Sequence, residues 1–560
     1  MEFNYKKNDN SQLFKDFEKD ELLNIFNIQN YVPIYKKFFS LNENNYNSIN
    51  LNNENYLVRM NKKLSENIYQ CTIKNKENQE FEKIVFFKLS GILDPFKYMA
   101  GKYPVNDNLL VLPKFNNDAC DKVLDSNNCS YVDSFFSFLT SILLNKMGFI
   151  HGTDFYGSYI GIKNNLHIDV CDDIDSYSCN DFFQQNLNNL FYFINSDHEE
   201  ILNQNSRRNK KPIEIGDEIS LDVLTLDDIV NLDTPKCENI NELSTKNTNL
   251  VVCDDEIINN SKSLSSKSSS SKSDCSSRSS NTNNDNESSD DDDENDDSES
   301  SEDNSSDMEN IMVSINQFPI QIIALENCKD TFDSLLSNDS INNDELGCII
   351  GQILMILITY QKMFSFTHND LHTNNIMYIE TEKKYLYYKV NDRHYKIPTY
   401  GKIFKIIDYG RAIYKFKGQL MCSDSFHKEG DANSQYNCEP YFNENKPRLD
   451  PNPSFDLCRL GCSIYDFICE KYENMKQIKN PIHKLIINWC IDDDGRDILY
   501  KTNGEERYPD FKLYKMIARK VNKHKPIDEL QKSYFERFVV SRKAIKKGSF
   551  IWNIDELEHQ

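Results

Sequence analysis

Three polar side chains in the C-terminal half of the chain have the types that phosphoryl transfer requires. Asp370 and Asn375 lie close together after a strongly apolar stretch, and Asp408 follows an apolar run that predicts a strand. A carboxylate can orient an attacking hydroxyl and accept its proton, whereas an amide and a second carboxylate can hold Mg²⁺ on phosphate groups. Together, Asp370, Asn375 and Asp408 supply the two carboxylates and the amide that this chemistry needs.

Lys88 is the cation that this chemistry would need on the other side of the phosphates. It stands among apolar residues of a predicted strand, residues 84–89. An unpaired ammonium is costly in such a place, so we expect Lys88 to bind phosphate groups. The alternative is a lysine whose stem lies along the strand while its amine reaches solvent.

The elements that must position these residues follow from the spacing of apolar side chains. A buried helix is predicted over residues 344–364, because the run 348–358 is apolar almost throughout. Further helices are predicted over residues 13–28 and 131–147, strands over residues 56–60, 68–73, 84–89 and 320–325, and a hairpin over residues 385–401 with its turn at Asn391-Asp392.

The net charge of −24 is concentrated in one part of the chain. Residues 281–310 hold 14 acidic residues and no lysine or arginine. Residues 261–310 consist almost entirely of Ser, Asp, Glu and Asn, a composition that predicts disorder. The rest of the chain has no basic stripe, so nucleic-acid binding is not expected.

Neither the apolar segments nor the cysteines indicate secretion or a membrane. The longest apolar run, residues 348–358, is too short to cross a bilayer, and the N-terminus lacks the apolar core of a signal peptide. The 16 cysteines include no pair separated by two residues, and Cys458 and Cys462 are expected to pack in a core. These features predict an intracellular protein without a transmembrane segment, while the oligomeric state stays open.

The order of these motifs resembles that of the protein kinase superfamily. His368-x-Asp370-x₄-Asn375 is similar to the catalytic loop of that family, and residues 408–410 (Asp-Tyr-Gly) are similar to its Asp-Phe-Gly element. The resemblance implies that Asp370 is the catalytic base and that Asn375 and Asp408 are metal ligands. Lys88 matches the strand lysine that binds the phosphates of ATP. The resemblance extends over roughly residues 56–467.

The resemblance also implies supporting positions. Residues 324–328 are similar to the last small-lobe strand and the hinge that holds adenine, and residues 454–465 to the helix whose buried aspartate braces the catalytic loop. The implied nucleotide-binding residues are Lys88, Leu325, Glu326, Cys328 and Asp408. The implied structural residues are His368, Gly410, Asp456 and Asp133, the last as the candidate ion-pair partner of Lys88.

The fold implied by the resemblance is α+β and has two lobes, a small β-rich one and a large α-helical one, with a long disordered acidic insertion. In chain order it divides the sequence into residues 1–55, an N-terminal helical extension and linker; 56–164, the first part of the small lobe; 165–310, an insertion; 311–337, the last small-lobe strand and hinge; and 338–560, the large lobe and C-terminal region.

The implied activity is transfer of the γ-phosphoryl group of ATP to Ser or Thr hydroxyls of a protein substrate, with Mg²⁺ as cofactor. Asp370-Leu-His372 and the hairpin resemble haspin-like atypical kinases, and the Asn-, Lys- and Ile-rich composition is similar to that of putative serine/threonine kinases of giant DNA viruses, which would place the protein in a host cytoplasm or virion. A small-molecule kinase of the aminoglycoside or choline type, which also uses an Asp-Leu-His loop, is one alternative. A catalytically weak pseudokinase or scaffold is the other.

The sequence departs from the family pattern at three places. No glycine precedes Gly91, so the glycine-rich loop that covers the phosphates is missing ahead of Lys88. Asn369 replaces the arginine of the catalytic loop, so activation through a phosphorylated loop bound to that arginine is not expected. No Ala-Pro-Glu element occurs between Gly410 and Asp456.

Overall fold

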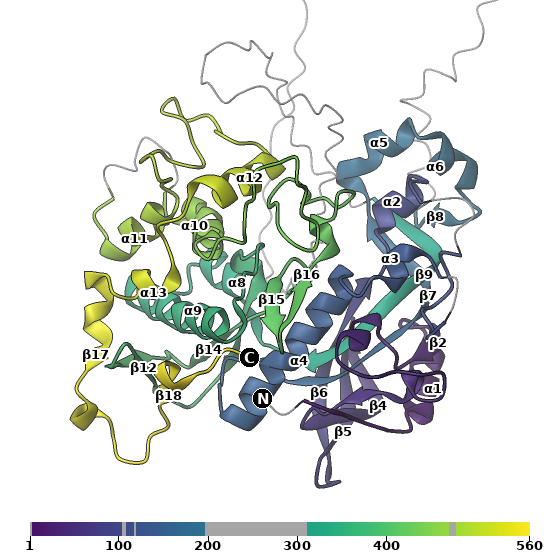
Figure 1. The fold of residues 1–560 in the computed structure, drawn as a ribbon, viewed down its shortest axis with the longest axis horizontal. Coiled ribbons are helices and arrows are strands. Elements are labelled where there is room, and N and C mark those ends of the chain that lie inside the picture. The colour runs from purple at the N-terminus through teal and green to yellow at the C-terminus, as the bar shows by residue number, and fades with distance from the viewer. Residues whose placement is uncertain (1–2, 104–107, 117–118, 196–310, 470–477) are drawn as a thin grey trace, which may run out of the picture. The chain divides into compact units, whose positions relative to one another are not determined.

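The protein has a mixed α+β fold, seen in a computed structural model that describes residues 3–103, 108–116, 119–195, 311–469 and 478–560 (Figure 1). Most of the region expected to be an insertion, including the 261–310 segment predicted to be disordered, lies outside the described residues.

A seven-stranded antiparallel sheet organises the first part of the described chain. Its strands run in the order β2, β7, β9, β6, β5 and β4, and β8 pairs with β9 beside this path. Their bounds are β2 Ile25–Gln29, β4 Asn55–Ser65, β5 Ile68–Asn75, β6 Glu80–Gly91, β7 Phe155–Asp169, β8 Phe191–Phe193 and β9 Met312–Glu326. Residues 165–169 and 191–193, at the start of the region expected to be an insertion, therefore belong to the sheet.

The N-terminal residues also join this sheet, and here the predicted helix over residues 13–28 is wrong in its second half. Helix α1 (Ser11–Lys19) buries Leu13 and Phe17 but stops at Asp20. Asn24 and Asn27 take positive φ angles of 40° and 54°, which end helical geometry. The chain then pairs with β7 as strand β2, because an edge of the sheet offers its backbone groups there.

Helix α4 (Cys129–Met147) follows the predicted 131–147 helix closely and packs against β7 and β9 (Figure 1). The Asn128 side chain accepts a hydrogen bond from Ser130 N at 3.1 Å and caps the first turn. Gly148, with a φ of 79°, ends the helix in the left-handed region that glycine adopts without strain. Most side chains of α4 are buried, so the helix is fixed along most of its length.

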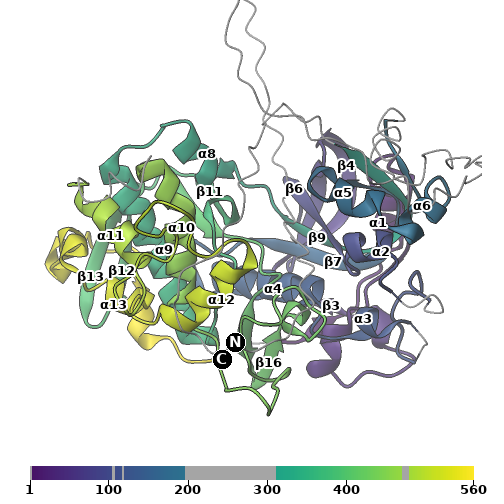
Figure 2. The same cartoon turned by 90° about the horizontal axis from the view of Figure 1, so that it is seen from above.

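Helix α9 (Asn343–Phe364) confirms the predicted 344–364 helix. Among the described residues it is the one helix long and apolar enough to cross a membrane, and 89% of its most apolar 18-residue window is buried inside the protein. It packs against α11, α13, β13 and β14 (Figure 2). Its apolar composition is therefore that of a core helix.

Besides short 3-10 helices, the remaining described elements of the C-terminal part are five more α-helices and three small sheets. The helices are α8 Phe332–Ser337, α10 Phe455–Ile468, α11 Pro481–Trp489, α12 Phe511–Lys520 and α13 Pro526–Glu529. One sheet holds β10 Asp330–Thr331, β11 Ile376–Glu380 and β14 Lys402–Ile406, the second β17 Val539–Val540, β13 Arg393–Pro398, β12 Tyr385–Val390 and β18 Trp552–Asn553, and the third β15 Ile413–Phe416 and β16 Gln419–Cys422. The short elements of the first part are β1 Tyr5–Lys6, β3 Asn50–Leu51, α2 Pro95–Met99, α3 Asp121–Leu124, α5 Ile174–Ser178 and α6 Asp181–Asn186.

His151 connects the α4–β7 loop to two of the C-terminal strands. Its ring is fully buried, with Nδ1 2.7 Å from the Phe404 carbonyl oxygen and Nε2 2.6 Å from the Tyr388 hydroxyl. A neutral ring satisfies both contacts, since Nδ1–H donates to the carbonyl and Nε2 accepts from the hydroxyl. Burial lowers the pKa of His151 to about 4, although the Phe404 hydrogen bond opposes this.

This histidine is expected to make the protein less stable in acid. Between pH 6.5 and about 4 the unfolded chain binds a proton that folded His151 does not, so the free energy of unfolding should fall by about 3 kcal/mol across that range. Urea unfolding at several pH values should show a His151→Gln variant losing less stability than the wild type. Replacing the exposed His559 with Gln should keep the wild-type slope, and equal slopes for all three proteins would contradict the prediction.

Candidate active site

Lys88 of β6 forms ion pairs with two carboxylates from distant parts of the chain. Its Nζ lies 2.7 Å from Asp133 Oδ2 on α4 and 2.8 Å from Asp408 Oδ1. Burial alone would lower the pKa of Lys88, but the two carboxylates outweigh this effect and raise it. The amine is therefore charged and ion-paired, on a side chain that is 22% exposed. These two ion pairs favour a binding role over a lysine whose amine is free in solvent.

Asp133, the candidate partner of Lys88, also contacts the Asp-Tyr-Gly segment. Its side chain is 3% exposed, and its Oδ1 accepts a hydrogen bond from Tyr409 N at 2.9 Å. Asp408 itself has a φ of 63°, and its Oδ1 lies 3.4 Å from Gly410 N. Burial would raise the pKa of Asp408, but the Lys88 ammonium holds it below its usual value. Asp133 thus joins the start of this segment to both α4 and Lys88.

Asn375 and Asp408 are brought together by the pairing of two short strands. Asn375 immediately precedes β11, Asp408 follows β14, and the antiparallel register places Ile376 opposite Ile406. A further backbone hydrogen bond extends this pairing beyond the strands, from Ile407 N to Asn375 O at 3.0 Å. The two predicted metal ligands therefore lie at the same end of the β11–β14 strand pair.

The loop of residues 368–375, the predicted catalytic loop, orients the Asn375 amide. Its Nδ2 donates to Asp370 O at 2.9 Å and lies 3.1 Å from His372 Nε2. His368 supports the loop from below, with Nε2 2.9 Å from Ile407 O. With Nδ2 engaged in these contacts, Oδ1 is the atom of the Asn375 amide that would suit a hard cation.

Asp456 of α10 holds the backbone of the catalytic loop. Its carboxylate is fully buried and accepts hydrogen bonds from His368 N at 2.9 and 3.1 Å and from Asn369 N at 2.9 Å. Bonds from backbone N–H groups to a carboxylate are among the stronger ones in proteins. Asp456 thus makes the contacts expected of a bracing aspartate from the sequence of residues 454–465.

Asn369, which replaces an arginine of the family pattern, is an uncharged tether. It is fully buried with a φ of 65°, a region that asparagine tolerates better than most residues. Its Nδ2 donates to Arg411 O at 3.0 Å, and its Oδ1 accepts from the Tyr436 hydroxyl at 2.9 Å. The amide fixes the catalytic loop to the chain that follows Gly410 without introducing a charge.

Asp370 is surrounded by donors and positive charge. Tyr514 of α12 donates its hydroxyl to Asp370 Oδ1 at 2.6 Å, and Arg411 Nη1 lies 3.9 Å from Oδ2. Burial would raise the pKa of Asp370, but Arg411 and Arg459 outweigh it and bring the pKa to about 2. The carboxylate is therefore ionised at neutral pH. Sequence reasoning missed Tyr514, Arg411 and Arg459, although Arg411 is next to Gly410 and Arg459 lies within the 454–465 motif.

The predicted hinge residues lie at the end of β9, where Glu326 has an unexpected role. Its carboxylate is ion-paired with Lys405, which is 1% exposed and donates to Gly152 O at 2.8 Å. The backbone N–H of Glu326 donates to Asp154 O at 3.0 Å, so this group is already engaged in a hydrogen bond within the protein. Leu325 pairs with Phe86 and Phe155 within the sheet. Burial raises the pKa of the Cys328 thiol to about 12, so this thiol stays neutral.

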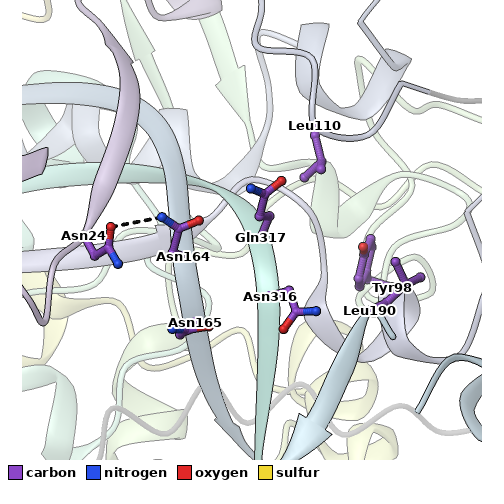
Figure 3. Close-up of a pocket in the computed structure, with 8 residues that line it drawn as sticks. All are labelled: Asn24, Tyr98, Leu110, Asn164, Asn165, Leu190, Asn316 and Gln317. Carbon is purple, nitrogen blue, oxygen red and sulfur yellow. Dashed lines mark hydrogen bonds between the residues drawn. The ribbon is translucent and has the colours of Figure 1, made fainter. Parts of the chain in front are cut away.

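A surface hollow of about 560 Å³ lies elsewhere, beside β7 and β9 (Figure 3). Amide side chains dominate its lining, and Asn164 Nδ2 donates to Asn24 Oδ1 at 3.0 Å. Uncharged amides neither accept a proton nor balance the charge of a phosphate. Its lining includes none of the predicted site residues.

No family model matches the chain. It is 26% identical over 182 residues to "Uncharacterized protein 098R" of Invertebrate iridescent virus 6. The match covers 31% of this chain and 27% of that viral protein, so the chain spans about a quarter of the length of the curated relative that it matches.

Proposed function

We propose that the protein is a divergent serine/threonine-protein kinase with a two-lobed fold, which transfers the γ-phosphoryl group of ATP to a protein hydroxyl. One observation carries the proposal: Lys88 of β6 is ion-paired with both Asp133 of α4 and Asp408 beyond β14. A strand lysine that is ion-paired with a helix carboxylate, beside the acid of an Asp-Tyr-Gly segment that could hold Mg²⁺, is the arrangement that a nucleotide phosphate site of this class uses. The similarity to an iridovirus protein supports a viral source.

The residues present fit a magnesium ion. Asp408 and Asn375 offer oxygen ligands at the same end of the β11–β14 strand pair. Mg²⁺ commonly binds one or two protein side chains together with substrate phosphates. The Asp408 side chain is 41% exposed and so remains accessible. When bound there, the ion would neutralise charge on the phosphates of ATP.

The roles of the chain's own groups follow from their contacts. Lys88, kept charged by two carboxylates, would bind α- and β-phosphate oxygens, and Asp133 would hold its ammonium in place. Asp370, ionised and braced through Asp456, would orient the acceptor hydroxyl and take its proton. Asn369 would keep this loop in register with Arg411 without an activating phosphate.

A pseudokinase is the second candidate, and the turn between β4 and β5 favours it. This turn contains Glu66 and Asn67 instead of glycines, and Asn67 O accepts a hydrogen bond from Phe87 N at 2.8 Å, next to Lys88. Side chains at this turn would hinder the close backbone approach to phosphates that glycines allow.

The test is transfer of label from γ-labelled Mg-ATP by the full chain to casein or histone, compared with choline and an aminoglycoside, alongside a thermal shift with Mg-ATP. We expect label in protein hydroxyls and a raised melting temperature that a Lys88→Met variant does not show. Label only in the small molecules would support the small-molecule kinase. A thermal shift without transfer would support the pseudokinase, and the absence of both would reject the proposal.

A further inference from the structure

Helix α12 brings a hydroxyl directly to the predicted catalytic carboxylate. The Tyr514 hydroxyl donates to Asp370 Oδ1 at 2.6 Å and accepts from Arg459 Nε at 2.9 Å. Burial, together with the charge of Asp370, raises the pKa of Tyr514 to about 12. The phenol therefore stays protonated at neutral pH and remains a hydrogen-bond donor to Asp370.

Aromatic rings and guanidinium groups fix Tyr514 in this position. Its ring stacks on Phe511 at a centroid distance of 5.2 Å and an angle of 11°, and it lies 6.0 Å from the Phe455 ring of α10. The Arg411 and Arg459 guanidinium groups lie 5.6 and 5.2 Å from the Tyr514 ring centroid. Arg411 is in turn ion-paired with Asp431. The contact is thus a packed arrangement and not a chance approach of a surface side chain.

We propose that Tyr514 occupies the acceptor-hydroxyl position, so that α12 competes with the substrate for Asp370; this inference rests on the proposed kinase function. A general base must lie within about 2.6–3.2 Å of the hydroxyl whose proton it takes. Tyr514 already holds that position on Oδ1, and Arg411 Nη1 lies 3.9 Å from the second oxygen. A substrate hydroxyl that approaches Oδ1 along the same direction must displace the phenol, which makes Tyr514 a determinant of acceptor affinity.

The consequence is a specific effect on the acceptor and none on the nucleotide. Losing the Tyr514 hydroxyl removes its hydrogen bond to Asp370, together with the one that it accepts from Arg459. Loss of the competing bond to Asp370 should lower the KM for a protein acceptor roughly tenfold. The KM for ATP should not change, because Tyr514 contacts neither Lys88 nor Asp408 among the interactions of the described residues. A purely structural tyrosine would instead affect both constants or the stability.

The experiment compares the wild type with two variants. Tyr514→Phe removes the hydroxyl and keeps the packed ring, whereas Tyr514→Ala removes the ring as well. Both should lower the acceptor KM, the alanine variant at least as much as the phenylalanine variant. Tyr508→Phe is the matched control, since that tyrosine belongs to the same segment but lies against Lys512. An unchanged or raised acceptor KM in both Tyr514 variants would overturn the inference.

A binding measurement separates this inference from the proposed function. Fluorescence anisotropy of a labelled casein-derived serine peptide needs no turnover, and its affinity should rise in Tyr514→Phe relative to the wild type. Tighter peptide binding without phosphoryl transfer would support the occupied position while rejecting an active kinase. Transfer by the wild type with equal peptide affinity in both proteins would reject the role of Tyr514 and leave the kinase proposal standing.

Discussion

Replacing Asp370 with asparagine is expected to lower the rate of phosphoryl transfer by about 10²–10⁴-fold. Asparagine has nearly the same shape and can still accept the Tyr514 hydrogen bond, but it carries no charge and cannot take a proton. Since Asp370 has a pKa of about 2, the wild-type group is a carboxylate throughout the neutral range, and the variant removes that base at every usable pH. Initial rates at saturating Mg-ATP and acceptor measure the effect.

The Asp370→Asn variant should still bind Mg-ATP, because Lys88, Asn375 and Asp408 are unchanged. A thermal shift equal to that of the wild type would show this. Asp392→Asn is the matched control: Asp392 is 93% exposed at the hairpin turn and has a φ of 58°, which asparagine also adopts. A variant at Asp370 that kept more than about a tenth of the wild-type rate would show that this carboxylate is not the base.

Replacing Asp456 with alanine is expected to reduce the free energy of unfolding by about 3–5 kcal/mol. The buried carboxylate accepts hydrogen bonds from two backbone N–H groups, those of His368 and Asn369. Alanine would leave both donors buried without an acceptor, and each such group costs about 1–3 kcal/mol. Urea unfolding followed by far-UV circular dichroism measures the loss.

Asp466→Ala is the comparison for this variant, since Asp466 lies on the same helix but is exposed and accepts a surface hydrogen bond from Tyr500 at 3.2 Å. Its effect should stay within about 0.5 kcal/mol. Phosphoryl transfer should fall in Asp456→Ala as well, because the loop that carries Asp370 loses its brace. A loss of stability no larger than that of Asp466→Ala would contradict the bracing role.

The parts of the fold that could be predicted are those determined by nearby residues. Helices α4 and α9 show their apolar spacing and their capping asparagines in the sequence itself. The β12–β13 hairpin turns at Asn391 and Asp392, which both take the positive φ angles that such turns need. Strand β2 could not be predicted, because its spacing fits a helix and only the distant strand β7 makes it a strand.

The candidate site divides in the same way. Asp370, Asn375 and Asp408 were found from their spacing, and Lys88 from a charge on an apolar strand. The ion pair of Glu326 with Lys405 and the contact of Tyr514 with Asp370 have no local motif, because each joins side chains that meet only in three dimensions. Sequence patterns report what a segment does alone, whereas these contacts depend on how separate elements pack.

The long pairing of β7 with β9 makes Met312 a point that three strands share. Asp169 of β7 lies opposite Met312, and Ile194 N, next to β8, donates to Met312 O at 2.9 Å. A substitution that broke the pairing at Met312 would therefore disturb β7, β8 and β9 at once, and with them the sheet whose strand β6 carries Lys88.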